Sequence, residues 1–300
     1  MLRILLARLR QGHRTLAFPD QLPALPDRFR GHPALDPTRC VDGCRDCIDA
    51  CPTDALAIDA DGLGLNLGRC LFCPECTSAC PTGAIAFTTG HRMAARHRDD
   101  LVVRLGMRER AQALDDKLLR LFRRSLKLRQ VSAGGCNGCE ADVNVLGTIV
   151  FDLGRFGIQY VASPRHADGL LITGPVTENM KLALEKTYQA VPPPKIVIAV
   201  GACAISGGPY AGHDEVGGGA ESVVPVDLYI PGCPPHPLTI LDGLLSMLDR
   251  IGPERAPATA PPAPGDQELR WAQARADDAL RSLGADFGRA KHSSNRDPDS

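Results

Sequence analysis

Between residues 126 and 251, short apolar runs alternate with longer segments in which apolar residues recur every three or four positions. The short runs predict strands at 127–132, 159–162, 169–173, 195–200 and 226–230. The longer segments predict helices at 140–153, 177–190 and 237–250. The run at 196–200 is apolar throughout, which is typical of a strand buried on both faces of a parallel sheet. The alternation predicts a doubly wound, flavodoxin-like α/β domain over 126–251.

The remaining segments have other patterns. Residues 1–16 interleave leucines with arginines, which suits a short amphipathic helix. Such a helix lies on an anionic membrane or a membrane partner, or packs on its own protein, and the pattern favours neither reading. A proline-rich stretch at 18–38 is expected to run extended. The basic segment 91–125 predicts a helical connector, because it carries an apolar stripe at Leu114, Leu118, Leu121 and Phe122.

The C-terminal part, 252–300, reads as a Pro/Ala linker followed by a helix-like segment at 266–284 and a polar tail. The predicted division of the chain is therefore an N-terminal segment, a cysteine-rich domain, a connector, the α/β domain and this tail, at 1–38, 39–90, 91–125, 126–251 and 252–300.

Composition narrows the function classes. The formal net charge is -1 and the 300 residues include one Trp, four Tyr and eight Phe, which argues against a nucleic-acid binder. No apolar run is long enough to span a bilayer. The first twenty residues show neither a secretory signal nor a twin-arginine address, so a reducing compartment is expected. There, thiols are more often metal ligands than disulfides.

Eight of the twelve cysteines form an internal repeat. The first copy holds Cys40, Cys44, Cys47 and Cys51 before Pro52, and the second holds Cys70, Cys73, Cys76 and Cys80 before Pro81. The second copy has the bacterial ferredoxin spacing, in which the cysteine before proline ligates the other cluster. This assigns Cys40, Cys44, Cys47 and Cys80 to one [4Fe-4S] cluster, and Cys51, Cys70, Cys73 and Cys76 to a second. Cys40 departs from the pattern by one extra residue before Cys44.

The other four cysteines each follow a predicted strand. Cys136 and Cys139 lie in a glycine-rich loop after 127–132, Cys203 follows 195–200, and Cys233 follows 226–230. If these strands are parallel, all four thiols meet at the carboxyl edge of one sheet, where open α/β sheets bind ligands. The sequence therefore predicts a third cluster in that crevice. The glycine-rich stretch 206–219 is too long for a tight turn and is expected to be a functional loop.

Several alternatives stay open. Paired CxxC units also build zinc sites, and a flavodoxin-like domain also binds flavin, although cysteines stand here where a phosphate would bind. Acidic residues around the repeat either steer a redox partner or form a solvated surface. Glu140 and Asp142 read as proton carriers or as helix-start residues. His166, His213 and His236 read as ligands, as proton carriers or as surface and hydrogen-bonded side chains. The chain has no Ser/His/Asp or paired-carboxylate catalytic constellation.

Three motifs, Cys136-Asn-Gly-Cys139, Gly201-Ala-Cys203 and Pro231-Gly-Cys233-Pro-Pro, resemble the small-subunit family of membrane-bound [NiFe] hydrogenases, which is related to the 20 kDa subunit of complex I. The repeat is similar to the polyferredoxin subunit of hydrogenase-4 and formate hydrogenlyase complexes. The chain thus resembles a fusion of two neighbouring subunits. The CxxC pair favours hydrogenase, since the complex I subunit carries adjacent cysteines. His236 departs from the resemblance, because relatives often have arginine there.

The resemblance implies an iron-sulfur electron-transfer subunit with three [4Fe-4S] clusters and no catalytic residue of its own. The catalytic metal centre would lie on a [NiFe] hydrogenase-type large subunit, with membrane-arm subunits and a soluble electron donor or acceptor as further partners. The implied location is peripheral, on the cytoplasmic side of the cell membrane. A second hypothesis is an electron-transfer subunit of a complex I-like, quinone-reducing assembly without nickel.

Overall fold

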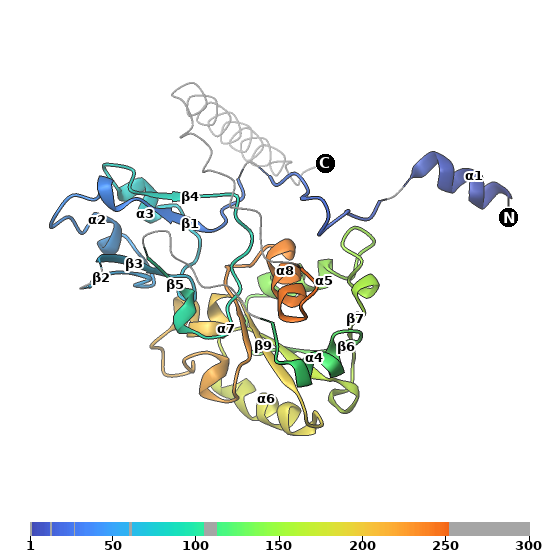
Figure 1. The fold of residues 1–300 in the computed structure, drawn as a ribbon. Coiled ribbons are helices and arrows are strands. Elements are labelled where there is room, and N and C mark those ends of the chain that lie inside the picture. The colour runs from blue at the N-terminus through green and yellow to red at the C-terminus, as the bar shows by residue number, and fades with distance from the viewer. Residues whose placement is uncertain (1, 13, 27, 60–61, 105–112, 252–300) are drawn as a thin grey trace, which may run out of the picture. The chain divides into compact units, whose positions relative to one another are not determined.

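The structure is a computed structural model that describes residues 2–12, 14–26, 28–59, 62–104 and 113–251 (Figure 1). The linker and helix predicted at 252–265 and 266–284 lie outside the described residues.

A five-stranded sheet forms the centre of the second half of the chain. Its strands are β6 (Leu126–Ser132), β7 (Ile158–Tyr160), β8 (Gly169–Thr173), β9 (Ile196–Val200) and β10 (Leu228–Ile230). Their order across the sheet is β10-β9-β8-β6-β7, and every neighbouring pair is parallel. Numbered along the chain this is the flavodoxin order 2-1-3-4-5, with its switch point between β6 and β8. The predicted flavodoxin-like parallel sheet is confirmed, and each predicted strand segment contains a strand.

Side chains from successive strand positions enter two separate cores, because neighbouring residues of a strand point to opposite faces. On β9, Ile196, Ile198 and Val200 pack with one cluster of buried residues, while Val197 and Ala199 pack with the other. The first cluster includes α5 (Gly138–Val145) and α8 (Pro237–Met247). The second includes residues of α6 (Glu178–Ala190) and α7 (Ala202–Ser206). Helices on both faces explain why the strands are apolar throughout.

The helix after β6 is much shorter than predicted, and a short helix after β9 was not predicted. The helix predicted at 140–153 ends as α5 at Val145, after which Gly147 and Thr148 donate to carbonyls only three residues back. These short-range hydrogen bonds tighten the chain into a turn, helped by the low helix propensity of Gly147. The short helix α7 was not predicted. It follows Gly201, whose φ of +91° is readily available only to glycine.

The ferredoxin lobe (residues 33–104) contains the cysteine repeat and two small antiparallel sheets. One pairs β1 (Pro33–Leu35) with β4 (Ile85–Phe87). The other has the order β2-β3-β5, from Leu56–Asp59, Gly62–Asn66 and Val102–Arg104. Short helices α2 (Asp46–Asp49) and α3 (Glu75–Ala79) occupy equivalent places in the two copies of the repeat.

The helical connector predicted at 91–125 is wrong for its first part. Residues 102–104 form strand β5, which pairs antiparallel with β3. Two consecutive β-branched residues, Val102 and Val103, suit this place at the edge of the small sheet. Within the described part of this segment, α-helix is confined to α4 (Asp116–Phe122), where Phe122 of the predicted stripe is buried but Leu121 is exposed.

The ferredoxin lobe is joined to the α/β domain by backbone and side-chain hydrogen bonds. Ala95 and Tyr229 exchange backbone hydrogen bonds of 3.0 and 2.8 Å, which extends the β10 edge. The Ser206 hydroxyl donates to the Gly68 carbonyl over 2.8 Å. One buried apolar cluster contains residues of both, including Leu67 and Leu101 of the lobe and Ile205 of α7. The lobe therefore packs on the α7 side of the sheet.

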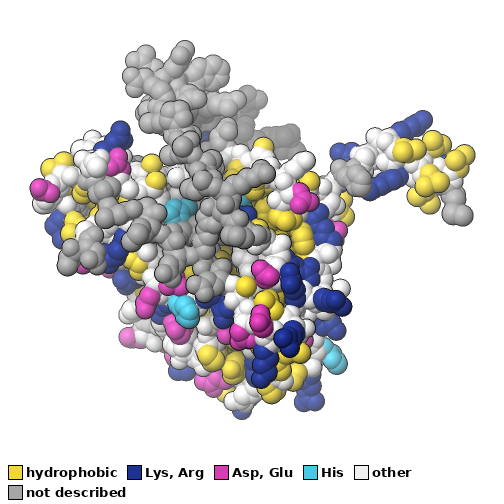
Figure 2. Space-filling view, viewed as in Figure 1, with side chains coloured by type: hydrophobic (Ala, Val, Ile, Leu, Met, Phe, Trp, Pro, Cys, Tyr) yellow, Lys and Arg dark blue, Asp and Glu magenta, His cyan; other side chains and the backbone are white. Residues whose placement is uncertain are grey.

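Helix α1 (Leu2–Gln11) has no buried residue, so it does not pack on the rest of the described chain (Figure 2). After it, Leu16 donates its N–H to the Val150 carbonyl and joins the α/β domain. The extended course predicted for 18–38 is interrupted by turns in which Gln21 and Phe29 donate to the carbonyls of Ala17 and Pro26, and by a 3₁₀ helix at Pro37–Arg39. None of the described helices has the length and hydrophobicity needed to cross a bilayer.

Candidate metal centres

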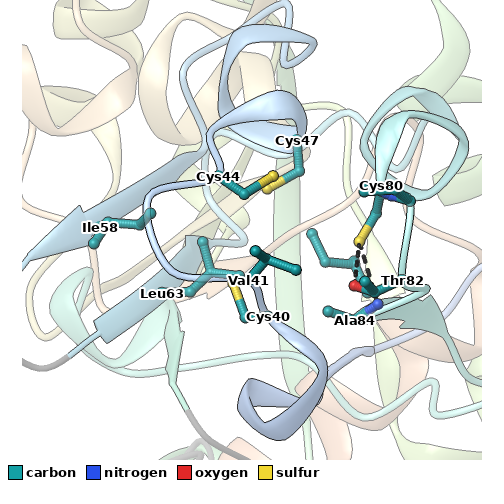
Figure 3. A pocket seen from close by; sticks show the side chains of 11 residues that line it. Cys40, Val41, Cys44, Cys47, Ile58, Leu63, Cys80, Thr82 and Ala84 are labelled. Carbon is teal, nitrogen blue, oxygen red and sulfur yellow. Dashed lines mark hydrogen bonds between the residues drawn. The ribbon is translucent and has the colours of Figure 1, made fainter.

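The first four-thiol site lies in the ferredoxin lobe. Cys40, Cys44, Cys47 and Cys80 line one small hollow together with apolar side chains such as Val41 and Leu63. Figure 3 shows Cys44 and Cys47 at one side of this hollow and Cys80 at the other, where it follows α3. Burial raises the pKa of the Cys47 thiol, and the neighbouring Cys80, Cys40 and Cys44 raise it further. The grouping thus crosses between the two copies of the repeat, as the ferredoxin spacing predicts.

The second site contains the complementary four thiols. Burial raises the pKa of Cys70 to about 12, and the nearby Cys76, Cys51 and Cys73 add to the shift. Burial likewise raises the pKa of Cys76 to about 11, again with contributions from Cys73 and Cys51. Cys51 of the first copy therefore lies with the three leading cysteines of the second. The mutual repulsion of the thiolates favours the neutral thiols unless a cation binds between them.

Backbone N–H groups point at sulfur in both copies. Cys51 Sγ accepts from the N–H of Ala55, and Cys80 Sγ accepts from that of Ala84, each over 3.2 Å. Cys70 Sγ accepts from Phe72 over 3.3 Å. At Cys80, burial raises the pKa, but the N–H of Ala84 and the hydroxyl of Thr82 outweigh it, so the pKa is lowered. Donors of this kind stabilise negative charge on sulfur and are one of the protein's means of setting a cluster's potential.

The third site lies at the carboxyl edge of the parallel sheet. Burial raises the pKa of Cys203 to about 11, followed by contributions from Cys233 and Cys136. Burial also raises the pKa of Cys139, with Cys203 as the next cause. The four thiols that follow β6, β9 and β10 therefore come together. Cys136 and Cys233 are exposed, whereas Cys139 and Cys203 are half-buried.

Two glycines leave room for these sulfur atoms. A Cβ added at Gly201 would lie 2.5 Å from Cys139 Sγ, and one at Gly208 would lie 2.8 Å from Cys203 Sγ. Both glycines have positive φ, of +91° and +58°. Any side chain here would therefore be strained and would displace a thiol. The backbone therefore approaches the crevice closely just after β9.

Glu140 has a role that neither sequence reading predicts. Its buried carboxylate accepts hydrogen bonds from Ser132 Oγ over 2.6 Å and Thr173 Oγ1 over 2.7 Å. Burial raises the pKa of Glu140, but these two hydroxyl donors outweigh it and lower the pKa. The carboxylate therefore ties α5 to the ends of β6 and β8. Ser132 and Thr173 end neighbouring strands, and this pair of hydroxyls could have indicated the role of Glu140. The pair is recognisable only when the order of the strands in the sheet is known.

Of the other polar candidates, His236 and Asp142 line the cleft that contains Cys73 and Cys233, whereas His166 and His213 are exposed. His236 precedes α8, and its Nδ1 accepts from the N–H of Leu238 over 3.2 Å. The Nδ1 atom of His213 accepts from the N–H of Glu215, also over 3.2 Å, and His166 is exposed in a short 3₁₀ turn. Asp142 lines an open cleft with Cys73 and Cys233, and its burial raises the pKa of its carboxyl.

The thiol sets fit iron-sulfur clusters. All twelve cysteines are free thiols. They fall into three sets of four, and a four-iron cluster takes four thiolate ligands. The sulfur-directed N–H groups and the glycine approaches fit the same chemistry.

A flavodoxin-like sheet with thiols at its carboxyl edge, joined to a ferredoxin lobe, defines an iron-sulfur protein of the oxidoreductase class. Comparison with known families agrees. Residues 136–247 match the family described as NADH ubiquinone oxidoreductase, 20 Kd subunit, and residues 39–84 match the 4Fe-4S dicluster domain.

Named relatives match between 39% and 53% of the chain. Formate hydrogenlyase subunit 7 of Escherichia coli is 42% identical over 156 residues, which are 52% of this chain and 61% of that protein. The probable membrane-bound hydrogenase subunit mbhJ of Pyrococcus furiosus is 36% identical, over 53% of this chain and 95% of that protein. An NADH-quinone oxidoreductase subunit of Geotalea uraniireducens is 45% identical, over 39% of this chain and 68% of that protein. The chain belongs to the 20 kDa subunit family of NADH ubiquinone oxidoreductase and carries a fused dicluster ferredoxin domain.

Proposed function

We propose that this chain is the electron-transfer subunit of a membrane-associated [NiFe] hydrogenase complex of the hydrogenase-4 or formate hydrogenlyase type. It would relay electrons through three [4Fe-4S] clusters to or from the active site of a large subunit. The proposed ligands are the three thiol sets, namely Cys40, Cys44, Cys47 and Cys80; Cys51, Cys70, Cys73 and Cys76; and Cys136, Cys139, Cys203 and Cys233.

The observation that carries this proposal is the continuity of the three sets. Burial raises the pKa of Cys76, and among the further causes is the thiol of Cys47 in the first set. Burial and Cys136 raise the pKa of Cys233, and Cys73 of the second set adds to the shift. Cys73 and Cys233 also line one open cleft. The second set therefore lies between the other two, which is the order that a conductor requires.

The chain's own residues would hold the clusters and set their surroundings. When bound, each cluster would supply one-electron redox chemistry at a potential that depends on hydrogen bonding, burial and nearby charge. In the ferredoxin lobe, the N–H groups of Ala55, Phe72 and Ala84 point at ligand sulfur. In the crevice, Cys136 and Cys233 are exposed, which leaves that site open for a partner to cover.

The type of large subunit that the chain binds distinguishes the two hypotheses. The names of two relatives, a formate hydrogenlyase subunit and a probable membrane-bound hydrogenase subunit, favour a [NiFe] hydrogenase-type large subunit. The name of the third favours a quinone-reducing, complex I-like assembly without nickel. The CxxC spacing of Cys136 and Cys139 supports the former. In either case membrane-arm subunits and a peripheral position on the cytoplasmic side of the membrane are part of the proposal, with a soluble electron donor or acceptor at the ferredoxin end.

Two measurements test the proposal. Anaerobically reconstituted protein is expected to contain about twelve iron atoms and an equal amount of acid-labile sulfide per chain, since each four-thiol set holds four irons. Zinc as the main metal, or iron near eight per chain, would contradict the three-cluster assignment. Purification of the native complex, with metal analysis of its large subunit, then decides between the hypotheses, because only the hydrogenase predicts nickel.

A further inference from the structure

The surface of α1 is strongly amphipathic. Leu2, Leu5, Leu6 and Leu9 recur at the i, i+3, i+4 and i+7 positions that share one helix face. Their side chains are exposed by 71%, 60%, 44% and 81%. Arginines flank this face on both sides, with Arg3 and Arg10 on one flank and Arg8 on the other. Figure 2 shows these hydrophobic and basic side chains close together on the helix.

The charge around this face has one sign. Residues 1–19 contain four arginines, at positions 3, 8, 10 and 14, and no aspartate or glutamate. The chain as a whole has a net charge of only -1, so this concentration of positive charge is local. An anionic surface complements it.

A second exposed apolar element lies where α1 joins the α/β domain. Thr15 Oγ1 donates to the carbonyl of Ile149, and the N–H of Leu16 donates to that of Val150, each over 2.8 Å. The side chain of Ile149 is 72% exposed and that of Val150 is 39% exposed. Thr15 is only four residues after the end of α1 at Gln11. Even a fully extended chain of that length would keep the two residues within about 14 Å of each other. The exposed Ile149 and Val150 are thus separated from the exposed leucines of α1 by only a short length of chain.

We propose that α1 together with Ile149 and Val150 forms a docking patch for an anionic lipid surface. This rests on the proposed function, since it specifies how the chain would contact its membrane. A bilayer interface accepts the apolar face of a helix while flanking arginines reach the headgroup phosphates. A planar surface also accommodates α1 and the 149–150 loop together. A groove in a protein would cover the leucine face but would leave the arginines on both flanks to find separate carboxylates.

Vesicle flotation of the full, anaerobically reconstituted chain tests this patch. The probes are vesicles of phosphatidylcholine alone and of phosphatidylcholine with phosphatidylglycerol. The chain is expected to float with the anionic vesicles and to be partly released by high salt, because exposed charges are screened. The double variant Leu5→Gln/Leu9→Gln keeps the charge and is expected to lower binding at least about tenfold. Ile149→Gln is expected to lower it by about threefold.

Matched variants separate apolar contact from charge. Arg8→Gln/Arg10→Gln is expected to remove most of the preference for anionic over neutral vesicles, by about tenfold. Leu182→Gln is the control, because Leu182 on α6 is 63% exposed but lies outside the patch. Its binding should equal that of the wild type.

Three results would overturn the inference. They are an absence of flotation with anionic vesicles, equal losses from Leu182→Gln and Leu5→Gln/Leu9→Gln, and binding to native membranes that is lost when their other subunits are stripped away. The last would assign α1 to a protein partner. Iron measured in the same samples keeps the two proposals apart, since a protein that floats with too little iron contradicts the proposed function alone.

Discussion

The ferredoxin lobe and the edge of the parallel sheet gather four thiols by different routes. In the lobe, each set takes three cysteines from one copy of a short repeat and one from the other copy. Backbone N–H groups four residues after Cys51 and Cys80 donate to sulfur in the same way in both copies. At the sheet, the four cysteines come from the ends of β6, β9 and β10, and glycines rather than spacing make room for them. The first arrangement is local, whereas the second depends on the whole sheet.

The two regions also differ in their exposure to solvent. Cys47, Cys70 and Cys76 of the lobe are buried, while Cys136 and Cys233 of the crevice are exposed. A cluster held in the lobe would be shielded mainly by this chain, and one held in the crevice would need a neighbouring subunit for the same protection. Under the proposed function, this difference makes the crevice the end of the thiol series that is expected to face a partner.

The largest effect is expected from breaking the crossed arrangement in the lobe. Cys80→Ser removes a thiol of the set that contains Cys40, Cys44 and Cys47, and should cost about four irons per chain. The paramagnetic signal of one reduced ferredoxin cluster should disappear, while the signal of the crevice cluster should stay. Damage confined to the cluster of Cys70, Cys73 and Cys76 would contradict the crossed assignment.

A smaller, partial loss is expected from narrowing the crevice. Gly201→Ala places a methyl group 2.5 Å from the present position of Cys139 Sγ and strains a φ of +91°. The crevice should lose part of its iron, with both ferredoxin signals unchanged, because the lobe does not depend on this turn. Gly218→Ala is the matched control, since an added Cβ there meets nothing within 4 Å. Equal iron loss in both variants would show that the close approach to sulfur is unimportant.

The smallest effect concerns the carboxylate that joins the strand ends. Thr173→Val removes one of the two hydroxyls that Glu140 accepts from and should cost about 1.5–3 kcal/mol of stability. Thr187→Val on α6 should cost less, because that hydroxyl donates to a carbonyl at an exposed position. Thermal unfolding of both variants and the wild type at neutral pH measures the difference.

The pKa of Glu140 also determines how its contribution to stability varies with pH. Burial opposes the ionised form of Glu140, but its hydroxyl donors outweigh burial and lower the pKa from 4.5. A carboxylate with a lowered pKa stabilises the fold above its unfolded value, and this contribution is lost only as pH falls through the folded value. Glu140 should therefore stay ionised, and its contribution constant, from about pH 8 to pH 5. A cost of Thr173→Val that shrinks across this range would show that Glu140 titrates there.

The sequence predicted the parallel sheet well because its strands are buried on both faces and read as unbroken apolar runs. The grouping of Cys136, Cys139, Cys203 and Cys233 followed from strand ends and the rule that parallel strands share a carboxyl edge. The crossing of Cys51 and Cys80 followed from motif spacing alone.

Other features could not be read from the chain. Strand β5 lies in a segment that looked helical, since its pairing with β3 depends on a long-range contact that periodicity does not report. The short helix α7 has too few residues to show a helical period. The hydrogen bonds from Ser132 and Thr173 to Glu140 require β6 and β8 to be neighbours. The order of strands along the chain does not specify which strands are neighbours in the sheet.

We propose that the three thiol sets form one series whose crevice end serves a partner's active site. Cys233→Ser in the assembled complex tests it most directly, because Cys233 belongs to the crevice and lies beside Cys73 of the lobe. Hydrogen turnover should be abolished, while dithionite still reduces both ferredoxin clusters and their paramagnetic signals remain. Turnover near the wild-type rate in a complex shown to lack the crevice cluster would mean that electrons bypass this site, and would contradict the claim.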